Sequence, residues 1–375
     1  MKRLVLCGGG HSHLEVLRRF GLDPVKGVEL VLVSPHRWTP YSGMLPGLVA
    51  GHYPFEAAHV DLEPLARFAG ARFVPTLVTA LDPAARTLAL ADGTRLEFDF
   101  ASLDIGSTPA SAGIPGAAEH ALAVKPVERF LRAWRDAVER ARAGTFRRGV
   151  VVGGGAAGIE LVLAMQHRIA QATGRRDAVA WQLVTDVGVL LPSHCPRARA
   201  IFERVLGERG IAVHRARPVA RVEPGGVCAA DGSAVAGDLI VWATGAGASP
   251  WLAASGLAVD DRGFVAVDET LRSVSHPHVF AAGDCASMIG HPRPKSGVYA
   301  VRQGPPLAAN LRRALAGGPL ERYRPQVEAL ALISTGDRYA VATRGAWALE
   351  GRWVWWWKDW IDRRFMRRYA RLSRL

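Results

Sequence analysis

The sequence is poor in cysteine and in long apolar runs. Four cysteines in 375 residues, Cys7, Cys195, Cys228 and Cys285, are too few and too widely spaced for a disulfide scaffold or a paired-cysteine metal site. No run of eighteen apolar residues occurs, so the sequence predicts no helix that crosses a membrane. These absences favour a reducing, cytoplasmic setting in which any membrane contact is peripheral.

Acidic residues are also in deficit. The chain has 34 Asp and Glu against 47 Lys and Arg, a formal net charge of +13 that favours contact with phosphates, anionic lipids or acidic ligands. Hydrophobic residues make up 49% of the chain, which is enough for a core and excludes a disordered protein. Glycine is plentiful, with 40 residues, and predicts many tight turns or close backbone approaches to a ligand.

A pattern of apolar strand, glycine-rich turn and amphipathic helix occurs twice. The turns are residues 8–10 and 153–158, and each copy closes on a second apolar strand that leads to a glycine, Gly106 or Gly245. Such a turn lets the backbone approach a pyrophosphate, which then lies on the helix N-terminus. Only the second turn has the full GxGxxG spacing, and a lone match fits an ordinary strand–helix turn about equally well. Two copies in register favour two nucleotide-binding modules.

A third motif follows in residues 279–286, where an apolar strand leads into Ala-Gly-Asp. With the two glycine turns, this motif resembles the pyridine nucleotide-disulfide oxidoreductase family of flavoproteins, in the branch of type II NADH dehydrogenases and sulfide:quinone oxidoreductases. Residues 8–14 and 39–47 are most similar to the flavoprotein module that is sometimes fused to selenophosphate synthetase. The resemblance extends over nearly the whole chain.

The resemblance implies an α/β fold with two Rossmann-like dinucleotide-binding domains. An FAD-binding domain would be discontinuous, formed by residues 1–115 and 250–318. An inserted NAD(P)H-binding domain would span residues 116–249, and residues 319–375 would form a short C-terminal segment for an interface or for membrane association.

The resemblance also implies site residues. The FAD contacts would be Gly8, Gly10, His11, Pro40, Gly106, Gly283 and Asp284, and the carboxylate of the last suits a ribityl hydroxyl donor. The NAD(P)H contacts would be Gly153, Gly155, Gly158 and Gly245. Two residues would act in catalysis: Glu160 would face the nicotinamide, and Lys295 would precede a helix whose N-terminus points at the flavin. His11 and His13 lack a third ligand nearby, so no metal site is expected.

Some positions depart from the family pattern. Ser34 stands where an acid would bind the ribose of the first dinucleotide. In the second module, Asp186 comes one place after the corresponding position, and Arg175 and Arg176 lie upstream. The sequence therefore leaves NADH and NADPH both open as the donor.

The acceptor is a separate question. No closely spaced cysteine pair follows the first glycine turn, so disulfide reductase activity is not predicted. Type II NADH dehydrogenases carry glutamines near the quinone; the chain keeps Gln303 but has Val298 and Arg302 where glutamines are expected. A quinone-like acceptor is the leading hypothesis, and a sulfur or selenium species is the alternative.

The last 25 residues carry eight basic and two acidic residues, and six of the eleven tryptophans fall in the last 29. An apolar stripe recurs at helical spacing, and tryptophan with arginine on such a helix is typical of an interfacial membrane anchor. The competing interpretation is a helix that packs on its own protein or across a homodimer. Nucleic-acid binding through arginine and aromatic stacking is less favoured, so no nucleic acid is expected as a partner.

The sequence-based hypothesis is thus an FAD-dependent NAD(P)H dehydrogenase that passes electrons to a small acceptor. It would be cytoplasmic. A further hypothesis is that it attaches peripherally to the inner face of the cell membrane. An alternative of another class is a non-catalytic flavin redox sensor whose basic tail binds nucleic acid or a partner.

Overall fold

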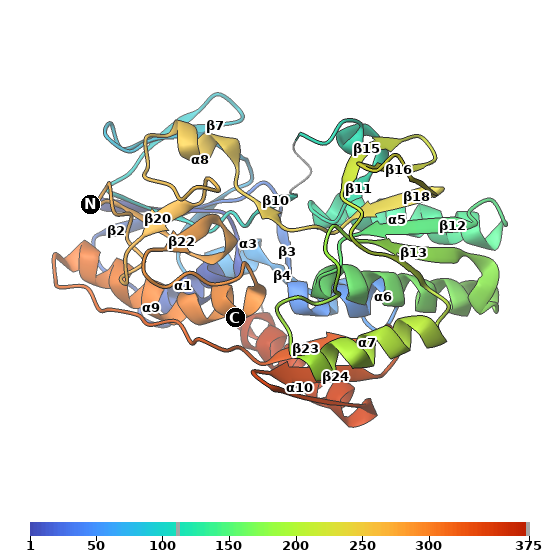
Figure 1. The fold of residues 1–375 in the computed structure, drawn as a ribbon. Coiled ribbons are helices and arrows are strands. Elements are labelled where there is room, and N and C mark those ends of the chain that lie inside the picture. Colours follow the sequence, from blue (N-terminus) through green and yellow to red (C-terminus); the bar gives the residue numbers. More distant parts are fainter. Residues whose placement is uncertain (110–112, 373–375) are drawn as a thin grey trace.

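Two parallel five-stranded sheets organise the chain, one in each lobe (Figure 1). The computed structural model describes residues 1–109 and 113–372. In the first lobe the strand order is β21-β9-β1-β2-β5, and every neighbouring pair is parallel. These strands are β1 (Lys2–Cys7), β2 (Val28–Val33), β5 (Ala71–Val74), β9 (Phe100–Leu103) and β21 (Val279–Ala281).

The second lobe repeats this plan with the order β11-β18-β12-β13-β14, again parallel throughout. Its strands are β11 (Leu122–Ala123), β12 (Arg148–Val152), β13 (Ala180–Val184), β14 (Ala212–His214) and β18 (Leu239–Trp242), and its long helices are α5 (Val127–Arg142), α6 (Ala156–Thr173) and α7 (Pro196–Glu208). The predicted α/β fold with two Rossmann-like units is confirmed.

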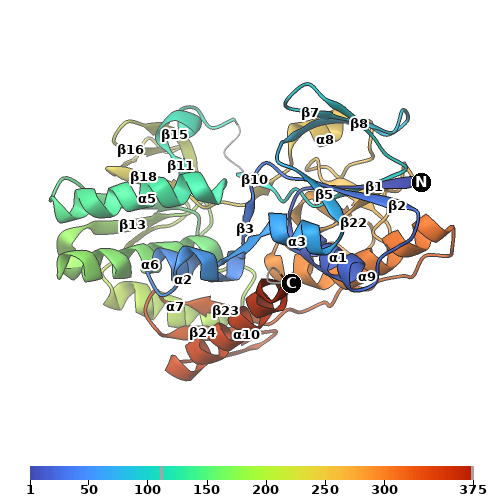
Figure 2. The ribbon, with the colours of Figure 1, turned by 180° about the vertical axis from the view of Figure 1, so that it is seen from behind.

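Each lobe begins with a strand that runs through a glycine turn into a helix. In the first lobe, α1 (His11–Leu22) follows β1 and packs beside α9 (Gly297–Ala316), as both ribbon views show (Figures 1 and 2). Leu14, Leu17 and Phe20 recur at helical spacing on α1 and are buried in the core of this lobe. Burial of that stripe is what stabilises so short a helix, because isolated helices of this length are marginal in water.

Short antiparallel elements complete both lobes. Each lobe has a three-stranded meander whose second turn contains an Asp-Gly pair, at Asp92 and Asp231, which is a sequence typical of hairpin turns. The strands are β6 (Val78–Asp82), β7 (Thr87–Leu90) and β8 (Arg95–Glu97) in the first lobe, and β15 (Val219–Glu223), β16 (Gly226–Ala229) and β17 (Ala234–Ala236) in the second. Other short elements include β3 (Trp38–Pro40), β4 (His59–Asp61) and α3 (Leu62–Phe68), while α2 (Leu45–Val49) packs against α6 of the second lobe.

The chain crosses between the two parallel sheets twice. It leaves the first sheet after β9 and returns to it at β21, next to β9. Where the two crossings meet, β10 (Thr108–Pro109) pairs with β19 (Ala246–Gly247). Each lobe has one glycine turn. The first follows the carboxyl end of β1, and the second follows the carboxyl end of β12.

The C-terminal part lies within residues 319–375 and contains more regular structure than a helix alone. It forms an antiparallel sheet and a long helix, which lie below both lobes in Figures 1 and 2 and contact each of them. The elements are β23 (Ala331–Ser334), β24 (Ala340–Arg344), β25 (Trp347–Gly351) and α10 (Arg352–Ala370). We call this part the C-terminal unit. In the described ranges, no helix has both the length and the apolar character needed to cross a bilayer.

The helix α10 turns its apolar stripe inward. Val354, Phe365 and Tyr369 belong to the predicted stripe, and all three are buried against the protein. The tryptophans exposed on α10 are Trp353, Trp356 and Trp360, with 52–55% of each residue accessible. The stripe therefore holds the helix on its own protein, and a different face meets the solvent.

Candidate functional site

The first glycine turn is shaped by Asp104, at the end of β9. Gly8 has φ +93°, and a Cβ atom on it would lie 2.4 Å from the Asp104 carbonyl oxygen. A Cβ atom on Gly10 would lie 2.3 Å from the Asp104 carboxyl carbon. Real Cβ atoms do not approach so closely, so both positions require glycine even before any ligand is considered.

The Asp104 side chain caps α1 from within this turn. Its Oδ2 accepts hydrogen bonds from the amides of Ser12 at 2.8 Å and His13 at 3.0 Å, and its carbonyl accepts from the amide of Gly10 at 3.1 Å. The residue is 2% exposed. Burial raises the pKa of this carboxyl to about 7, although the two amide bonds oppose the shift. Sequence reasoning did not single out Asp104, although it precedes the predicted Gly106 by two residues.

Asp284 lies near this turn, after β21. Its carboxylate pairs with Lys125 at 3.3 Å, and Lys125 also donates to the Ser107 hydroxyl at 3.0 Å. Gly283 has φ +69°, and its amide donates to the side-chain oxygen of Gln303 at 2.7 Å. Lys125 precedes α5, so a residue from the crossing between the lobes reaches the carboxylate that the sequence assigns to FAD.

The surroundings of the first turn fit a dinucleotide. The His11 Nε2 atom is buried, and no residue of the described ranges bonds to it. Burial also lowers the pKa of His11 to about 4, so the ring is neutral at physiological pH. Gly106 has φ +72°, and a Cβ atom there would meet only open space. The first turn thus combines closely approached glycines, open space at Gly106 and an unbonded His11 ring nitrogen. These features suit the binding of FAD.

The second turn has the same character. A Cβ atom on Gly158 would lie 1.9 Å from the carbonyl oxygen of Gly153, so this third glycine lets α6 pack against its own strand. Gly155 and Gly245 instead face open space, as close approach to a pyrophosphate requires. The Thr244 hydroxyl is buried without a partner among the described residues. These residues fit NAD(P)H.

Glu160 follows Gly158 on α6 and is covered by the C-terminal unit. Its Oε1 accepts from the Ser334 amide at 2.7 Å and from the Ser334 hydroxyl at 3.0 Å. Burial raises the pKa of Glu160, and the nearby charge of Lys358 opposes that rise. Glu160 thus belongs to a contact between α6 and β23 that sequence spacing does not reveal.

Lys358 is a buried charge near Glu160 that sequence reasoning missed. Its ammonium group donates to the Gly43 carbonyl oxygen at 2.5 Å and pairs with Asp362 at 2.6 Å. Burial disfavours the charge of Lys358, but Asp362 and Glu160 outweigh it and raise the pKa. The available signal was the spacing of four residues between Lys358 and Asp362 on a helix, which also suits a solvent-exposed pair.

The two remaining predicted residues, Pro40 and Lys295, lie far apart in the sequence. Pro40 ends β3, and the next residue, Tyr41, stacks on Phe365 of α10 with ring centroids 4.3 Å apart. The Lys295 ammonium lies 4.0 Å from the centre of the Phe264 ring and donates to the Ala286 carbonyl. Burial lowers the pKa of Lys295. It holds the loop before α9, while the expected contact of that helix with a flavin stays a prediction.

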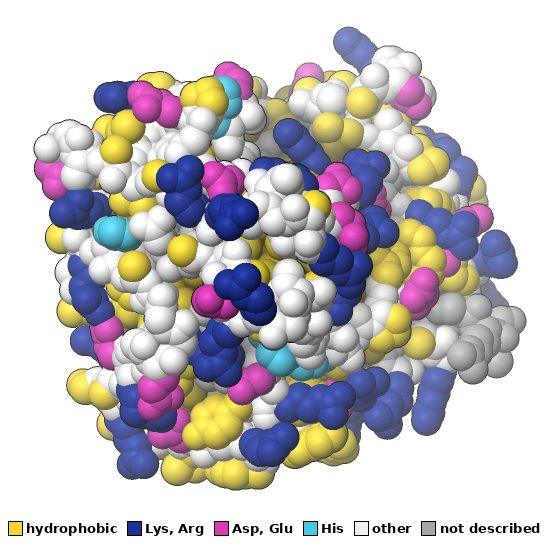
Figure 3. Space-filling model, turned by 90° about the vertical axis from the view of Figure 1, so that its right-hand side faces the viewer, with side chains coloured by type: hydrophobic (Ala, Val, Ile, Leu, Met, Phe, Trp, Pro, Cys, Tyr) yellow, Lys and Arg dark blue, Asp and Glu magenta, His cyan; other side chains and the backbone are white. Residues whose placement is uncertain are grey.

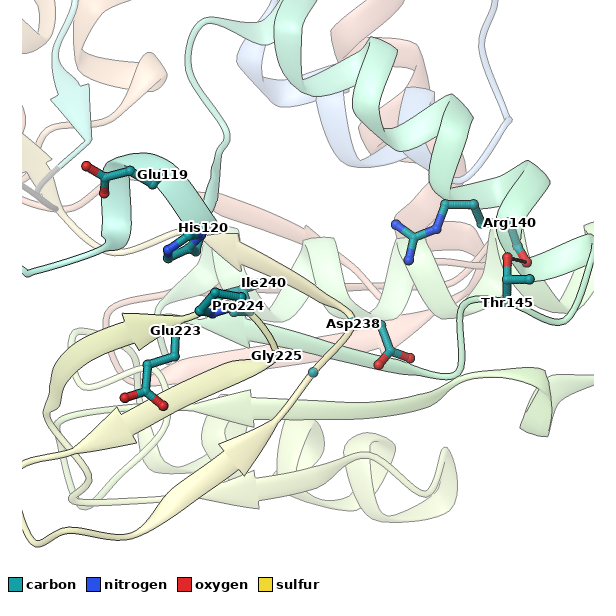
Figure 4. Close-up of a pocket in the computed structure, with 10 residues that line it drawn as sticks. Glu119, His120, Arg140, Thr145, Glu223, Pro224, Gly225, Asp238 and Ile240 are labelled. Atoms are coloured by element: carbon teal, nitrogen blue, oxygen red, sulfur yellow. Dashed lines mark hydrogen bonds between the residues drawn. The ribbon is translucent and has the colours of Figure 1, made fainter.

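A concave pocket of about 430 Å³ lies elsewhere, in the second lobe. Figure 4 shows Glu119 and His120 near Glu223, with Asp238 closer to Arg140. Asp238 immediately precedes β18, so the pocket lies at the amino ends of the parallel strands. Dinucleotides bind at the carboxyl ends of such strands, where the glycine turns are. This pocket is therefore separate from the candidate site.

Two glycine turns at the carboxyl ends of two parallel sheets define a class: the oxidoreductases that bind two dinucleotides. The comparison with family models identifies the family. The model described as pyridine nucleotide-disulphide oxidoreductase matches residues 2–304. The chain belongs to this family, and the prediction of such an oxidoreductase is confirmed.

Known proteins agree with this assignment. The chain is 30% identical over 234 residues to an NADH dehydrogenase-like protein of Mycobacterium tuberculosis, a match that covers 58% of this chain and 56% of that protein. Among solved structures, it resembles the sulfide:quinone oxidoreductase of Aquifex aeolicus, with a TM-score of 0.82, 19% identity and coverage of 99% of this chain and 92% of the other. It also resembles NDH2 of Plasmodium falciparum in complex with NADH, with a TM-score of 0.80, 14% identity and coverage of 98% and 97%. At these identities, the two structures show a shared fold.

Proposed function

We propose that the protein binds FAD in the first lobe and NAD(P)H in the second, and that it transfers electrons from NAD(P)H to a quinone-like acceptor. The observation that carries this proposal is the pair of glycine turns, each with open positions and a buried orphan polar atom beside it. Bound FAD would supply the redox chemistry, because it accepts a hydride and returns electrons to an acceptor. The chain would bind and orient the reactants.

Three groups of the chain support the acceptor half of the proposal. Glu160 lies on α6, and Lys358 and Asp362 lie on α10. Lys358 bonds to Gly43, three residues after Pro40, which the family resemblance implies as an FAD contact. Reduction of a quinone to a quinol consumes two protons. A partly buried carboxyl with a raised pKa is a suitable proton donor, so Glu160 would serve this step, while the Lys358 ammonium keeps its proton and would attract negative charge that develops on the quinone.

An anaerobic spectral titration tests the proposal. Protein reconstituted with FAD should be yellow, and NADH or NADPH should bleach the flavin band; comparing the two nucleotides also identifies the donor. A quinone, a polysulfide and a selenium compound, added separately, should then restore the band at different rates. A colourless reconstituted protein, or a flavin that neither nucleotide reduces, would overturn the proposal. Reduction without reoxidation by any acceptor would support a redox sensor instead.

We also propose that the outer face of α10 attaches the protein to a membrane surface. Trp353, Trp356 and Trp360 lie on one face at helical spacing and are exposed, and Arg364 stacks over Trp360. Tryptophan and arginine together favour the headgroup region of a bilayer. On the end of the second lobe, by contrast, Figure 3 shows basic side chains with acidic side chains between them.

Vesicle sedimentation tests the attachment. The triple variant Trp353→Ser, Trp356→Ser, Trp360→Ser should lose binding to vesicles with anionic lipid and keep its flavin spectrum. Trp134→Phe is a suitable control, because this tryptophan is buried in the second lobe. Light scattering on the unmodified protein tests the competing interpretation, in which this face of α10 contacts a second copy of the chain. A dimer that the triple variant breaks, with unchanged vesicle binding, would contradict the membrane proposal.

A further inference from the structure

Asp104 places a carboxylate at the helix terminus that the proposed FAD pyrophosphate would use. Three amides around the start of α1, those of Gly10, Ser12 and His13, already bond to oxygen atoms of Asp104. A helix N-terminus attracts anions because its free amides and the helix dipole both point at the ligand. Here a protein carboxylate and a dinucleotide pyrophosphate would share that terminus.

We propose that Asp104 must carry a proton when FAD is bound, so that the affinity for FAD falls as pH rises above neutral. The inference rests on the proposed binding of FAD in the first lobe. Two anions in one buried site repel each other strongly, because little water separates them. Protonation removes this repulsion, and a neutral carboxyl can also donate a hydrogen bond to a phosphate oxygen.

The groups that face Asp104 do not relieve the repulsion. On α1, His11 and His13 are neutral above pH 5, since burial lowers both pKa values to about 4. Asp284 adds a second carboxylate, and its partner Lys125 neutralises that one. Cys285 remains a thiol, because burial raises its pKa to about 12. Between pH 6 and pH 9, Asp104 is therefore the group in its described surroundings expected to change charge.

The direction of the pH effect follows from linkage. In the free protein, burial places the pKa of Asp104 at about 7. A bound pyrophosphate adds negative charge and raises that pKa further, so FAD binds the protonated form more tightly. Affinity is then constant below pH 7 and falls about tenfold for each pH unit above about 7, with one proton taken up per FAD bound.

The test is the dissociation constant for FAD of the full chain, measured by flavin fluorescence from pH 6 to pH 9. The unmodified protein should show the fall described above. Calorimetry at pH 8 in two buffers of different ionisation enthalpy should report uptake of about one proton per FAD. A pH-independent dissociation constant, or binding without proton uptake, would overturn the inference without requiring any variant.

The variant Asp104→Asn should make the dissociation constant independent of pH, because the amide keeps an acceptor oxygen for Ser12 and His13 but cannot ionise. At pH 9 it should bind FAD about 100-fold more tightly than the unmodified protein does. Asp238→Asn is the matched control: Asp238 also accepts two backbone amides, from Arg147 and Arg148 at 2.9 Å each, but it lies in the second lobe. It should follow the unmodified protein.

The two proposals fail in different ways. If no FAD binds at pH 6, where Asp104 is protonated, the proposed FAD site itself is wrong. If FAD binds at pH 6 and the fall at higher pH persists in Asp104→Asn, another group causes it and the inference is wrong. Circular dichroism of each variant at both ends of the pH range identifies any loss of fold, in which case the measurements on the unmodified protein decide.

Discussion

At the scale of single residues, buried charge distinguishes this chain from a generic dinucleotide-binding fold. Asp104 and Lys358 are buried, Glu160 is partly buried, and each bonds to a backbone group of another element. Burial of a charge costs free energy unless partners compensate it, so buried charged groups are candidates for functional residues. Two of the three were not among the residues that the sequence assigned to the site.

The first residue-scale prediction concerns Glu160. Glu160→Gln keeps an oxygen acceptor for Ser334 but removes the titratable proton. Reoxidation of the reduced protein by a quinone should slow by about 10²-fold, the lower end of the contribution of a general acid, while reduction by NAD(P)H stays within a few-fold. Stopped-flow absorbance separates the two half-reactions. Glu119→Gln, in the pocket of Figure 4, is the control and should leave both rates unchanged.

The second residue-scale prediction concerns stability. The pKa of Asp104 is about 7 in the folded protein and 3.8 in its ordinary state, so the folded form binds the extra proton between these values. The contribution of this group to the free energy of unfolding therefore falls as pH rises from about 4 to about 7, by about 4 kcal/mol in total. Urea denaturation of FAD-free protein should show the difference between the unmodified chain and Asp104→Asn falling over this range. A constant difference would contradict the assignment.

At the scale of elements, one glycine of the second turn is needed for helix packing and another for nucleotide binding. Gly158→Ala should lower the free energy of unfolding by about 1–3 kcal/mol, because the new Cβ atom would overlap the Gly153 carbonyl. Gly155→Ala should preserve stability, because its Cβ atom meets no protein atom, yet it should weaken NAD(P)H binding. Thermal melts without nucleotide and nucleotide titrations of both variants measure the two effects. Equal losses of stability would refute the distinction.

Elements also show where sequence reasoning succeeds. The two strand–turn–helix units and the Ala-Gly-Asp motif are local, so contiguous residues reveal them. The docking of α10 is not local: Lys358 reaches Gly43, and Tyr53 bonds to Asp359, across about 300 residues of chain. An amphipathic pattern predicts a helix with an apolar face but does not say which surface covers that face. The three strands β23–β25 were likewise unforeseen, because they are short and, among the described residues, form a separate sheet of their own.

At the scale of the whole molecule, the C-terminal unit joins the two lobes. Arg209 of the second lobe pairs with Asp337, and Arg204 pairs with Glu350, while α10 packs against the first lobe through Phe365. Deletion of residues 352–375 should therefore destabilise the protein and expose its core, instead of releasing a soluble enzyme from a membrane. The triple tryptophan variant should melt within a few degrees of the unmodified chain. A stable, monomeric deletion variant would contradict this expectation.

The contacts of the C-terminal unit also affect the thermal unfolding of the protein. Two lobes joined only by the crossings at β10 and β19 would be free to melt one after the other, as independent domains often do. Here a third body is fastened to both, through Lys358 and Gly43 on one side and through Ser334 and Glu160 on the other. Heat should therefore unfold the chain in a single calorimetric transition. The C-terminal unit, which belongs to neither parallel sheet, would then set the distance between the two bound dinucleotides.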